Sequence, residues 1–310
     1  MKEIDGFRDE NLHAKWRGDI RPIENVYIGE TFKISIPDSS TKQIMKDSST
    51  KSLKNIDGSK FDMAVGPIYV KGAKRGDILE VSIKKIETAN WGWSAVMKDF
   101  GLLKGLFKER LVLWDISDGL VTSASKNFLH GIKIPIRPFL GVIGTAPSSG
   151  EYPMIPPQHF GGNMDNKLIG EGSKLYLPVN KDGGLISFAD PHASQGDGEV
   201  CGTAVETSAK VTVSINVIRG KKLNFPRMVS KERGNGKVLV TQGFSPDLLQ
   251  AAKEAVKEMI SVISDYGFSK DEGYVLCSVA GNLKISEIVD EPNFGVSMSI
   301  PASILEAERS

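Results

Sequence analysis

The 310-residue sequence has only two cysteines, Cys201 and Cys277, and no apolar run long enough to span a membrane. Two cysteines are too few for a disulfide framework and indicate reduced thiols. The sequence also has no large excess of positive or negative charge, because 39 Lys and Arg balance 38 Asp and Glu. This balance argues against nucleic acid or an anionic membrane as a partner. The N-terminus has no apolar segment typical of a signal peptide, so we expect a cytoplasmic protein.

Basic residues are absent from one stretch, Ala189 to Glu206, which is rich in acids and glycine. Solvated charged surfaces usually mix lysine with acids, and glycine lets the backbone approach a small ligand closely. We therefore expect an acidic pocket that accepts a cation, with a turn-rich surface loop as the alternative. The wider window 158–206 concentrates the candidate groups: His159, Gly162, Asn163, Asp165, Asp190, His192, Gln195, Asp197, Glu199 and Glu206.

Short strands dominate the chain up to about residue 220. Apolar and polar residues alternate over 26–36, 67–87 and 211–217, which is the period of a half-buried strand. Residues 174–179 and 184–189 flank the turn Lys181-Asp182-Gly183 and are predicted to form a hairpin.

Two segments have little periodicity. The Ser- and Lys-rich residues 40–62 predict a long exposed loop. Residues 90–107 carry Trp91, Trp93 and Phe100, and this segment is either a loop that packs aromatics over a cleft or a core-facing connection.

The C-terminal part has a different pattern. Ser245 and Pro246 can begin a helix whose apolar residues recur at helical spacing until Gly267. A shorter helix near 272–280 and two strands follow. We therefore predict a mainly β (α+β) fold, with antiparallel sandwich or barrel-like sheets in a domain of residues 1–220 that carries the acidic site. Residues 221–310 are predicted to form a smaller α/β portion with one main helix, packed against that domain.

The most specific pair of candidate ligands is Asp190 and His192. They follow the apolar strand LISFA, so we expect both side chains at a strand end, where a rigid scaffold presents functional groups. An imidazole and a carboxylate can bind zinc, although an Asp–His pair can also simply hold a turn. The oxygen-rich residues nearby suit calcium as well, so the identity of the metal stays open.

Cys201 lies two residues after Glu199, which raises the possibility of a thiol nucleophile with a carboxylate base. No histidine or lysine stands beside it to favour the thiolate, and neighbouring carboxylates would raise the pKa of the thiol. A structural role for Cys201 is the better interpretation.

Four runs together resemble the acetamidase/formamidase family: GVIGTAPS (141–148), GGNMD (161–165), LYLPV (175–179) and ADPHASQGDGEVCGTAVE (189–206). The segments HAKW (13–16), IPD (36–38) and GPIYVKGAKRGDIL (66–79) are similar to further family motifs, so the resemblance covers nearly the whole chain. Two positions depart from the pattern. Ala189 stands where glycine often precedes Asp-Pro-His, and Arg75 stands where proline is common. Neither change removes a chemical group.

The resemblance implies a mainly β protein that hydrolyses short-chain amides such as formamide and acetamide to ammonia and the carboxylate. A divalent metal, zinc as first choice and calcium as the alternative, would activate water and polarise the carbonyl. The expected metal ligands are Asp190 and His192, joined by Asp165 and Asp38. Either Glu206 or Glu199 is the expected general acid/base. Gln195 is expected to assist catalysis, and the expected substrate-binding residues are Asn163, His159 and Gly162.

The competing hypothesis is a calcium-stabilised β-sandwich binding module without catalysis, in which Trp91 and Trp93 would form an aromatic platform. The expected partner of the enzyme is a small amide, and we expect a homo-oligomer, in the form of a dimer.

Overall fold

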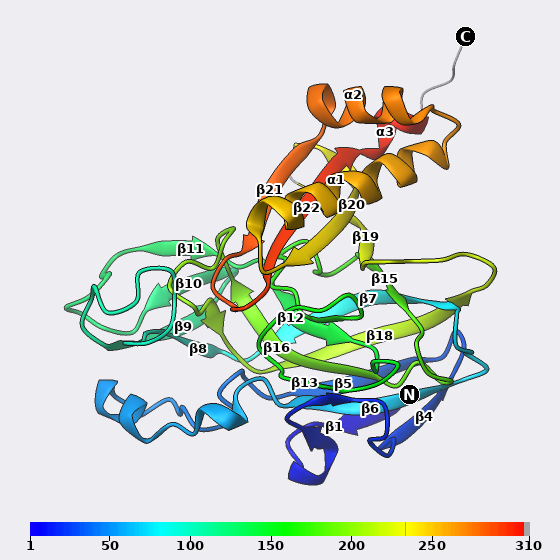
Figure 1. The fold of residues 1–310 in the computed structure, drawn as a ribbon. Coiled ribbons are helices and arrows are strands. Elements are labelled where there is room, and N and C mark those ends of the chain that lie inside the picture. The colour runs from blue at the N-terminus through cyan, green and yellow to red at the C-terminus, as the bar shows by residue number, and fades with distance from the viewer. Residues whose placement is uncertain (233, 307–310) are drawn as a thin grey trace.

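The computed structural model describes residues 1–232 and 234–306. The chain forms two large, mostly antiparallel sheets with few helices (Figure 1), which confirms the predicted mainly β fold. Eighteen strands, β1 to β18, precede residue 220. None of the helices in the described residues is long and apolar enough to cross a bilayer.

The first sheet has nine strands. Its third strand, β18, is the alternating segment predicted over 211–217, and the apolar residues Val211, Val213 and Ile215 of this strand are fully buried. In spatial order the strands are β1 (Lys2–Asp5), β5 (Thr31–Ile36), β18 (Ala209–Ile218), β7 (Ile78–Thr88), β15 (Lys174–Pro178), β19 (Arg227–Glu232), β20 (Gly236–Ser245), β22 (Phe294–Pro301) and β21 (Asn282–Glu287).

The second sheet has eleven strands and carries most of the acidic window. Its main path is β11 (Lys133–Pro135), β10 (Leu120–Ser123), β9 (Arg110–Ser117), β8 (Trp91–Val96), β17 (Val205–Glu206), β16 (Ile186–Ser194), β12 (Phe139–Gly144) and β14 (Gly161–Asn163). The remaining strands are β6 (Ala64–Lys71), which also pairs with β16, and its partners β2 (Leu12–His13) and β4 (Glu24–Tyr27). A separate pair joins β3 (Trp16–Arg17) to β13 (Glu151–Tyr152).

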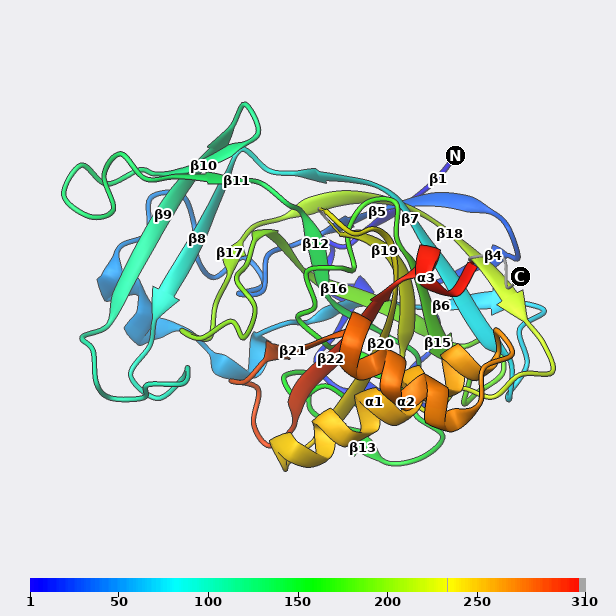
Figure 2. The same cartoon turned by 90° about the horizontal axis from the view of Figure 1, so that it is seen from above.

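The two sheets pack face to face around one main core, which confirms the predicted sandwich. Phe32, Ile34 and Val213 of the nine-stranded sheet belong to the same buried cluster as Ile68 and Phe188 of the eleven-stranded sheet. Seen from above, β8, β9 and β10 extend to one side of this core (Figure 2).

The helices cover the C-terminal strands (Figure 1). The main helix, α1 (Leu248–Ser264), buries Ala251, Ala255, Met259 and Ile263 in a second core together with β20 and β22. Its N-cap is Asp247, which accepts from the backbone of Gln250, and not Ser245 as expected. The other helices are α2 (Lys270–Ala280) and α3 (Ala302–Glu306), and short 3-10 turns are η1 (Asp9–Asn11), η2 (Thr50–Asn55) and η3 (Gly58–Lys60).

The predicted boundary at residue 220 stays a prediction. Strands β19 to β22 continue the nine-stranded sheet that the N-terminal strands begin, while the helices add their own core.

Three local predictions are wrong or incomplete. Strands β15 and β16 are not a hairpin, because β15 lies in the nine-stranded sheet and β16 in the other. The turn at Lys181–Gly183 therefore carries the chain between the sheets. The 40–62 segment is exposed only in part, since Ile44 and Leu53 pack against Trp93 and its ends are buried. The 90–107 segment begins as core-facing strand β8 and continues as a loop.

Candidate active site

Strand β16 supplies the centre of the site. We expected Asp190 and His192 at a strand end, and this prediction is wrong. Both residues lie within β16, where they are buried. The residue of β12 beside them is Gly141, and a Cβ added there would lie 2.2 Å from Asp190 Oδ2 and 2.4 Å from Asp165 Oδ1. The glycine of GVIGTAPS therefore makes room for two carboxylates between paired strands.

His192 has acids on both sides of its ring. Its Nε2 lies 2.9 Å from Asp190 Oδ2 and 3.0 Å from Glu206 Oε2. Neither oxygen lies in the direction of a hydrogen bond from Nε2, which has no such partner among the described residues. On the other side, Nδ1 lies 3.7 Å from Asp165 Oδ1.

Gln195 fixes the orientation of the ring. Its Nε2 donates to the backbone oxygen of Asp165 at 2.8 Å, which leaves Oε1 as the acceptor facing His192 Nδ1 at 2.9 Å. Nδ1 therefore carries a proton, and Nε2 is the nitrogen available to a ligand. Gln195 positions the imidazole from behind and lies outside the residues that line the cavity.

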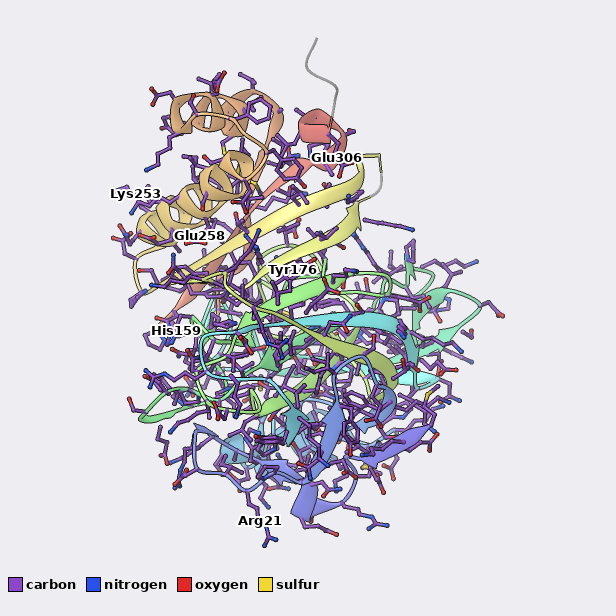
Figure 3. The ribbon with its side chains drawn as sticks, turned by 90° about the vertical axis from the view of Figure 1, so that its right-hand side faces the viewer. Arg21, His159, Tyr176, Lys253, Glu258 and Glu306 are labelled. Atoms are coloured by element: carbon purple, nitrogen blue, oxygen red, sulfur yellow. The ribbon has the colours of Figure 1, made fainter. Side chains whose placement is uncertain are left out.

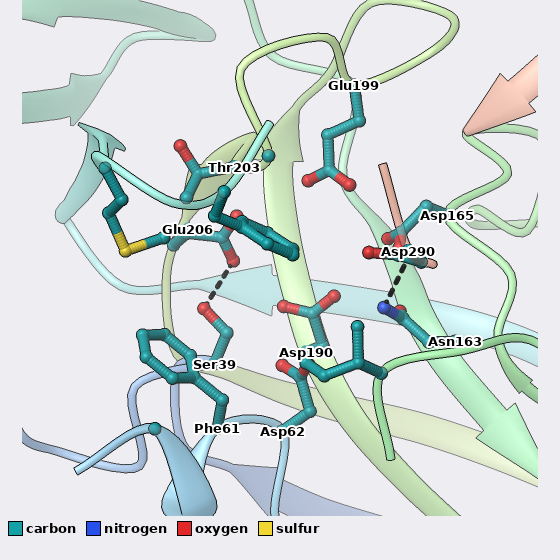
Figure 4. A pocket seen from close by; sticks show the side chains of 15 residues that line it. Ser39, Phe61, Asp62, Asn163, Asp165, Asp190, Glu199, Thr203, Glu206 and Asp290 are labelled. Carbon is teal, nitrogen blue, oxygen red and sulfur yellow. Dashed lines mark hydrogen bonds between the residues drawn. The ribbon is translucent and has the colours of Figure 1, made fainter. Parts of the chain in front are cut away.

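Asp165, Asp190 and Glu206 line a cavity of about 260 Å³ (Figure 4), and His192 contacts them from outside that lining. Six carboxylates line it: Asp62, Asp165, Asp190, Glu199, Glu206 and Asp290. Asn163 also lines it and donates to Asp290 Oδ2 at 2.9 Å, while Ser39 donates to Glu206 Oε2 at 2.8 Å. The backbone nitrogen of Ala204 donates to the other oxygen of Glu206 at 2.7 Å. Hydrogen bonds thus hold Glu206 on both oxygens.

Several of the acids have backbones in the left-handed region, which favours glycine. The φ angles are 54° at Asp62, 40° at Asp165, 55° at Asp190 and 46° at Glu199. Such conformations are uncommon outside glycine and cluster at functional sites, where the surrounding structure holds them. The surrounding structure therefore holds these four residues in an unfavourable backbone conformation that directs their carboxylates toward the same cavity.

The crowding of acids changes their protonation. Burial raises the pKa of Asp62, Asp190, Glu199 and Asp290 well above the usual carboxyl range, and neighbouring carboxylates add to the effect in all four. For His192, burial by itself lowers the pKa, but the charges of Asp190 and Glu206 raise it well above its usual range. Burial also opposes ionisation of Glu206, yet His192 lowers the pKa of that carboxyl. Without a further cation, burial and the neighbouring carboxylates therefore favour the protonated forms of these four acids.

The donor set fits a metal cation. Asp190, His192 and Glu206 offer ligand atoms within 4.8 Å of one another, and so do Asp165, His192 and Glu199. Asp165 Oδ1, Asp190 Oδ1 and His192 Nε2 are buried and have no hydrogen-bond partner among the described residues. Orphaned buried polar atoms are costly, and a cation coordinated by them would remove that cost.

The other predicted site residues have different places. Asp38 is buried outside the cavity lining, and its carboxylate already accepts from Trp93 Nε1 at 2.9 Å, from Ser40 and from the backbone of Lys42. His159 is exposed and lies at the periphery of the molecule in Figure 3, against Phe160. Gly162 pairs with β12 beside the site and does not line the cavity.

Sequence reasoning missed several lining residues. Asp62 ends the Ser/Lys-rich segment, and Asp290 comes from the turn between β21 and β22, far from the acidic window. The sequence signal that could have identified them is an acidic residue at the end of an irregular segment, next to a buried strand. The apolar residues Phe61, Met97, Phe100 and Ile155 complete the lining.

Comparison with known proteins assigns the family. The acetamidase/formamidase family model matches residues 3–153 and 151–307. The chain belongs to the acetamidase/formamidase family. This confirms the resemblance and, with it, the prediction of a hydrolase that acts on amide C–N bonds. The binding-module hypothesis required Trp91 and Trp93 to form an exposed aromatic platform. Trp93 is fully buried and cannot contribute to such a platform.

Individual relatives agree in fold over the full length. The crystal structure of a predicted acetamidase/formamidase from Thermoanaerobacter tengcongensis is 33% identical with a TM-score of 0.88, covering 98% of this chain and 97% of that one. An acetamidase structure from Bacillus halodurans is 30% identical with a TM-score of 0.89, covering 98% of each chain. A formamidase from Methylophilus methylotrophus is 26% identical and covers 96% of this chain and 90% of its own length.

Proposed function

We propose that this protein hydrolyses short-chain aliphatic amides such as formamide and acetamide, with a divalent metal held in the acidic cavity. The reaction is R–CO–NH₂ + H₂O → R–COO⁻ + NH₄⁺, in which the C–N bond breaks and a C–O bond forms. The observation that carries the proposal is the position of His192 Nε2 between Asp190 and Glu206, with no hydrogen-bond partner among the described residues.

The ligands would be His192, Asp190 and Glu206, with Asp165 beside the same ring. Mixed nitrogen and oxygen donors suit zinc, and the surplus of carboxylates keeps calcium as the alternative. When bound, the metal supplies Lewis acidity that polarises a carbonyl and lowers the pKa of water. Because Nδ1 donates to Gln195, the imidazole presents Nε2 to Asp190 and Glu206 in a fixed orientation.

Glu199 is the general acid/base in this proposal. Both Glu199 and Glu206 line the cavity, but Glu206 is held by Ser39 and Ala204 and has a lowered pKa. Burial raises the pKa of Glu199, which favours a protonated carboxyl that would donate to the departing nitrogen. Asn163 would position the amide, because its buried Oδ1 has no hydrogen-bond partner among the described residues and can accept a substrate N–H.

The test measures ammonia released from formamide and acetamide by protein of known metal content. We expect chelation to reduce the rate below about a hundredth, and re-addition of either zinc or calcium to restore it. Ammonia release that persists in metal-free protein would overturn the metal assignment and leave the amidase assignment standing. No release from any simple amide by metal-loaded protein would overturn the proposed substrates.

A matched variant controls for handling. His130 is exposed and lies outside the cavity lining, so metal-loaded His130→Ala should match the parent protein in rate and in metal content. The cytoplasmic location and the homodimer also remain proposals. The location is supported by two free cysteines.

A further inference from the structure

The active-site cavity has an apolar side that the hydrolytic chemistry does not use. Phe61, Met97, Phe100 and Ile155 line it together with the carboxylates. In Figure 4, Phe61 lies at the opposite end of the pocket from Asp165, Asp290 and Asn163. All four apolar residues are half-buried, so part of each side chain remains accessible at the cavity.

We propose that Phe61, Met97, Phe100 and Ile155 form an acyl-binding wall, and that the enzyme prefers linear amides longer than acetamide, such as butyramide and valeramide, to formamide. This inference rests on the proposed amidase function and specifies its substrate class. It assigns the polar side of the cavity to the carboxamide and the apolar side to the hydrocarbon chain.

The size of the cavity supports a longer substrate. A water molecule occupies about 30 Å³ in the liquid. Formamide is only a few times larger, whereas the cavity measures about 260 Å³. With formamide bound, most of the apolar wall would face water. Burial of a hydrocarbon chain against it removes that contact and is favourable. Binding pockets for drug-sized ligands begin at about 300 Å³, so a cavity of this size suits a small chain.

Rigid contacts hold part of the wall in place. Phe100 packs so closely on Gly202 that a Cβ added to that glycine would lie 2.4 Å from the phenyl ring. A Cβ added to the next residue, Gly101, would lie 2.6 Å from the carbonyl oxygen of Cys201. Leu102 then donates its backbone N–H to Val200 at 3.0 Å. The loop after β8 is thus fastened to the turn that carries Glu199.

The other end of the same loop is tied to a second acid-bearing turn. Lys104 forms an ion pair of 2.9 Å with Glu291, the neighbour of Asp290. Phe61 packs near Trp93, with ring centroids 6.5 Å apart, and Met97 contacts the same small core. A wall held from several sides can discriminate between substrates by contact, because it does not simply move aside.

Contact with such a wall sets the expected chain-length dependence. Each methylene that becomes buried in the transition state contributes about 0.8 kcal/mol, which corresponds to about fourfold in kcat/KM. We therefore expect kcat/KM to rise by about fourfold per carbon from acetamide through propionamide to butyramide, and to fall once the chain exceeds the cavity.

The experiment measures kcat/KM for the series from formamide to hexanamide with the metal-loaded enzyme, and the inhibition constants of the matching carboxylate products. Phe100→Ala should flatten the increase per carbon to less than twofold. Phe107→Ala is the matched control. It changes an exposed phenylalanine of the same loop, which lies outside the cavity lining, and should keep the parental slope.

The outcomes separate this inference from the proposed function. A parent enzyme that hydrolyses formamide best, or a Phe100→Ala variant with the parental slope, overturns the acyl wall while the amidase function stands. Loss of stability cannot imitate the expected result, because it would lower the rates for all amides equally. Absence of hydrolysis across the whole series would instead remove the proposed function itself.

Discussion

Two groups of residues face each other across the cavity, and they are built differently. Asp190, His192 and Glu206 lie on strands β16 and β17, inside a sheet whose register fixes their positions. The facing group comes from three connecting segments, 58–62, 97–101 and 288–291, and its acids are Asp62 and Asp290. Strands thus place three of the candidate metal ligands, and connections close the space around them.

This difference follows from what each group must do. Coordination requires atoms fixed to within a few tenths of an ångström, which paired strands provide. A boundary that selects substrates needs only shape, and loops can vary in shape while the scaffold stays the same. The two groups should therefore respond differently to substitution, with the strand-borne residues controlling turnover and the others controlling stability or selectivity.

The largest effect is expected at the strand-borne centre. His192→Ala removes the one side chain common to both candidate ligand groups, and kcat/KM should fall by more than about a thousandfold. The variant should stay folded, because the polar contacts of the ring are with Asp190, Glu206 and Gln195, and not with the apolar core between the sheets. Ammonia release, metal content and the circular dichroism melting curve measure these effects. Parental activity in a folded variant would show that His192 is not a ligand.

The sequence predicted the strand-borne group better than the other. The acids of the 158–206 window are close in sequence and free of lysine, so their proximity could be inferred. That Asp190 and His192 lie inside β16 was not predictable, because it depends on Gly141 of a neighbouring strand leaving room for carboxylates. The alternating strands and the main helix were predictable from their periods, since burial of one face imposes them.

The facing group could not be predicted for a physical reason. Asp62 and Asp290 are 228 residues apart in number, and only the packing of two sheets brings both to one cavity. Asp38 shows the opposite error. It ends an early strand and lies near the site, but Trp93 and Ser40 occupy its carboxylate, and no pattern in the sequence reveals those partners.

A smaller effect, on stability, is expected behind the facing group. Glu287 is buried at the end of β21, and burial raises its pKa to about 8 although the backbone of Val289 and Asp290 donates to it. Its carboxyl is therefore protonated in the folded protein over a range where the unfolded chain is ionised. The stability this provides is complete below the unfolded value of 4.5 and is lost as pH rises through about 8.

Glu287→Gln keeps an acceptor for both backbone donors and cannot ionise. In metal-free protein, the free energy of unfolding of the variant should exceed that of the parent by on the order of 2 kcal/mol at pH 9, and the two should converge near pH 5. Urea unfolding across this range measures the difference. Parallel stability curves for the two proteins would show that Glu287 does not titrate between these values.

The smallest effect is expected at Cys201, which lies where the two groups meet. Its backbone packs against Gly101 of the loop after β8, and it follows Glu199 by two residues. The thiol lies outside the cavity lining and donates to the backbone oxygen of Thr203 at 3.3 Å. A serine hydroxyl can make the same hydrogen bond, so Cys201→Ser should retain at least about half of the parental kcat/KM.

The same assay after chelation provides the contrast, because a thiol mechanism predicts the reverse pattern: an inactive serine variant with normal metal content, and a parent enzyme that resists chelators. The carboxylates that line the cavity favour a bound cation, whereas the thiol lies outside that lining.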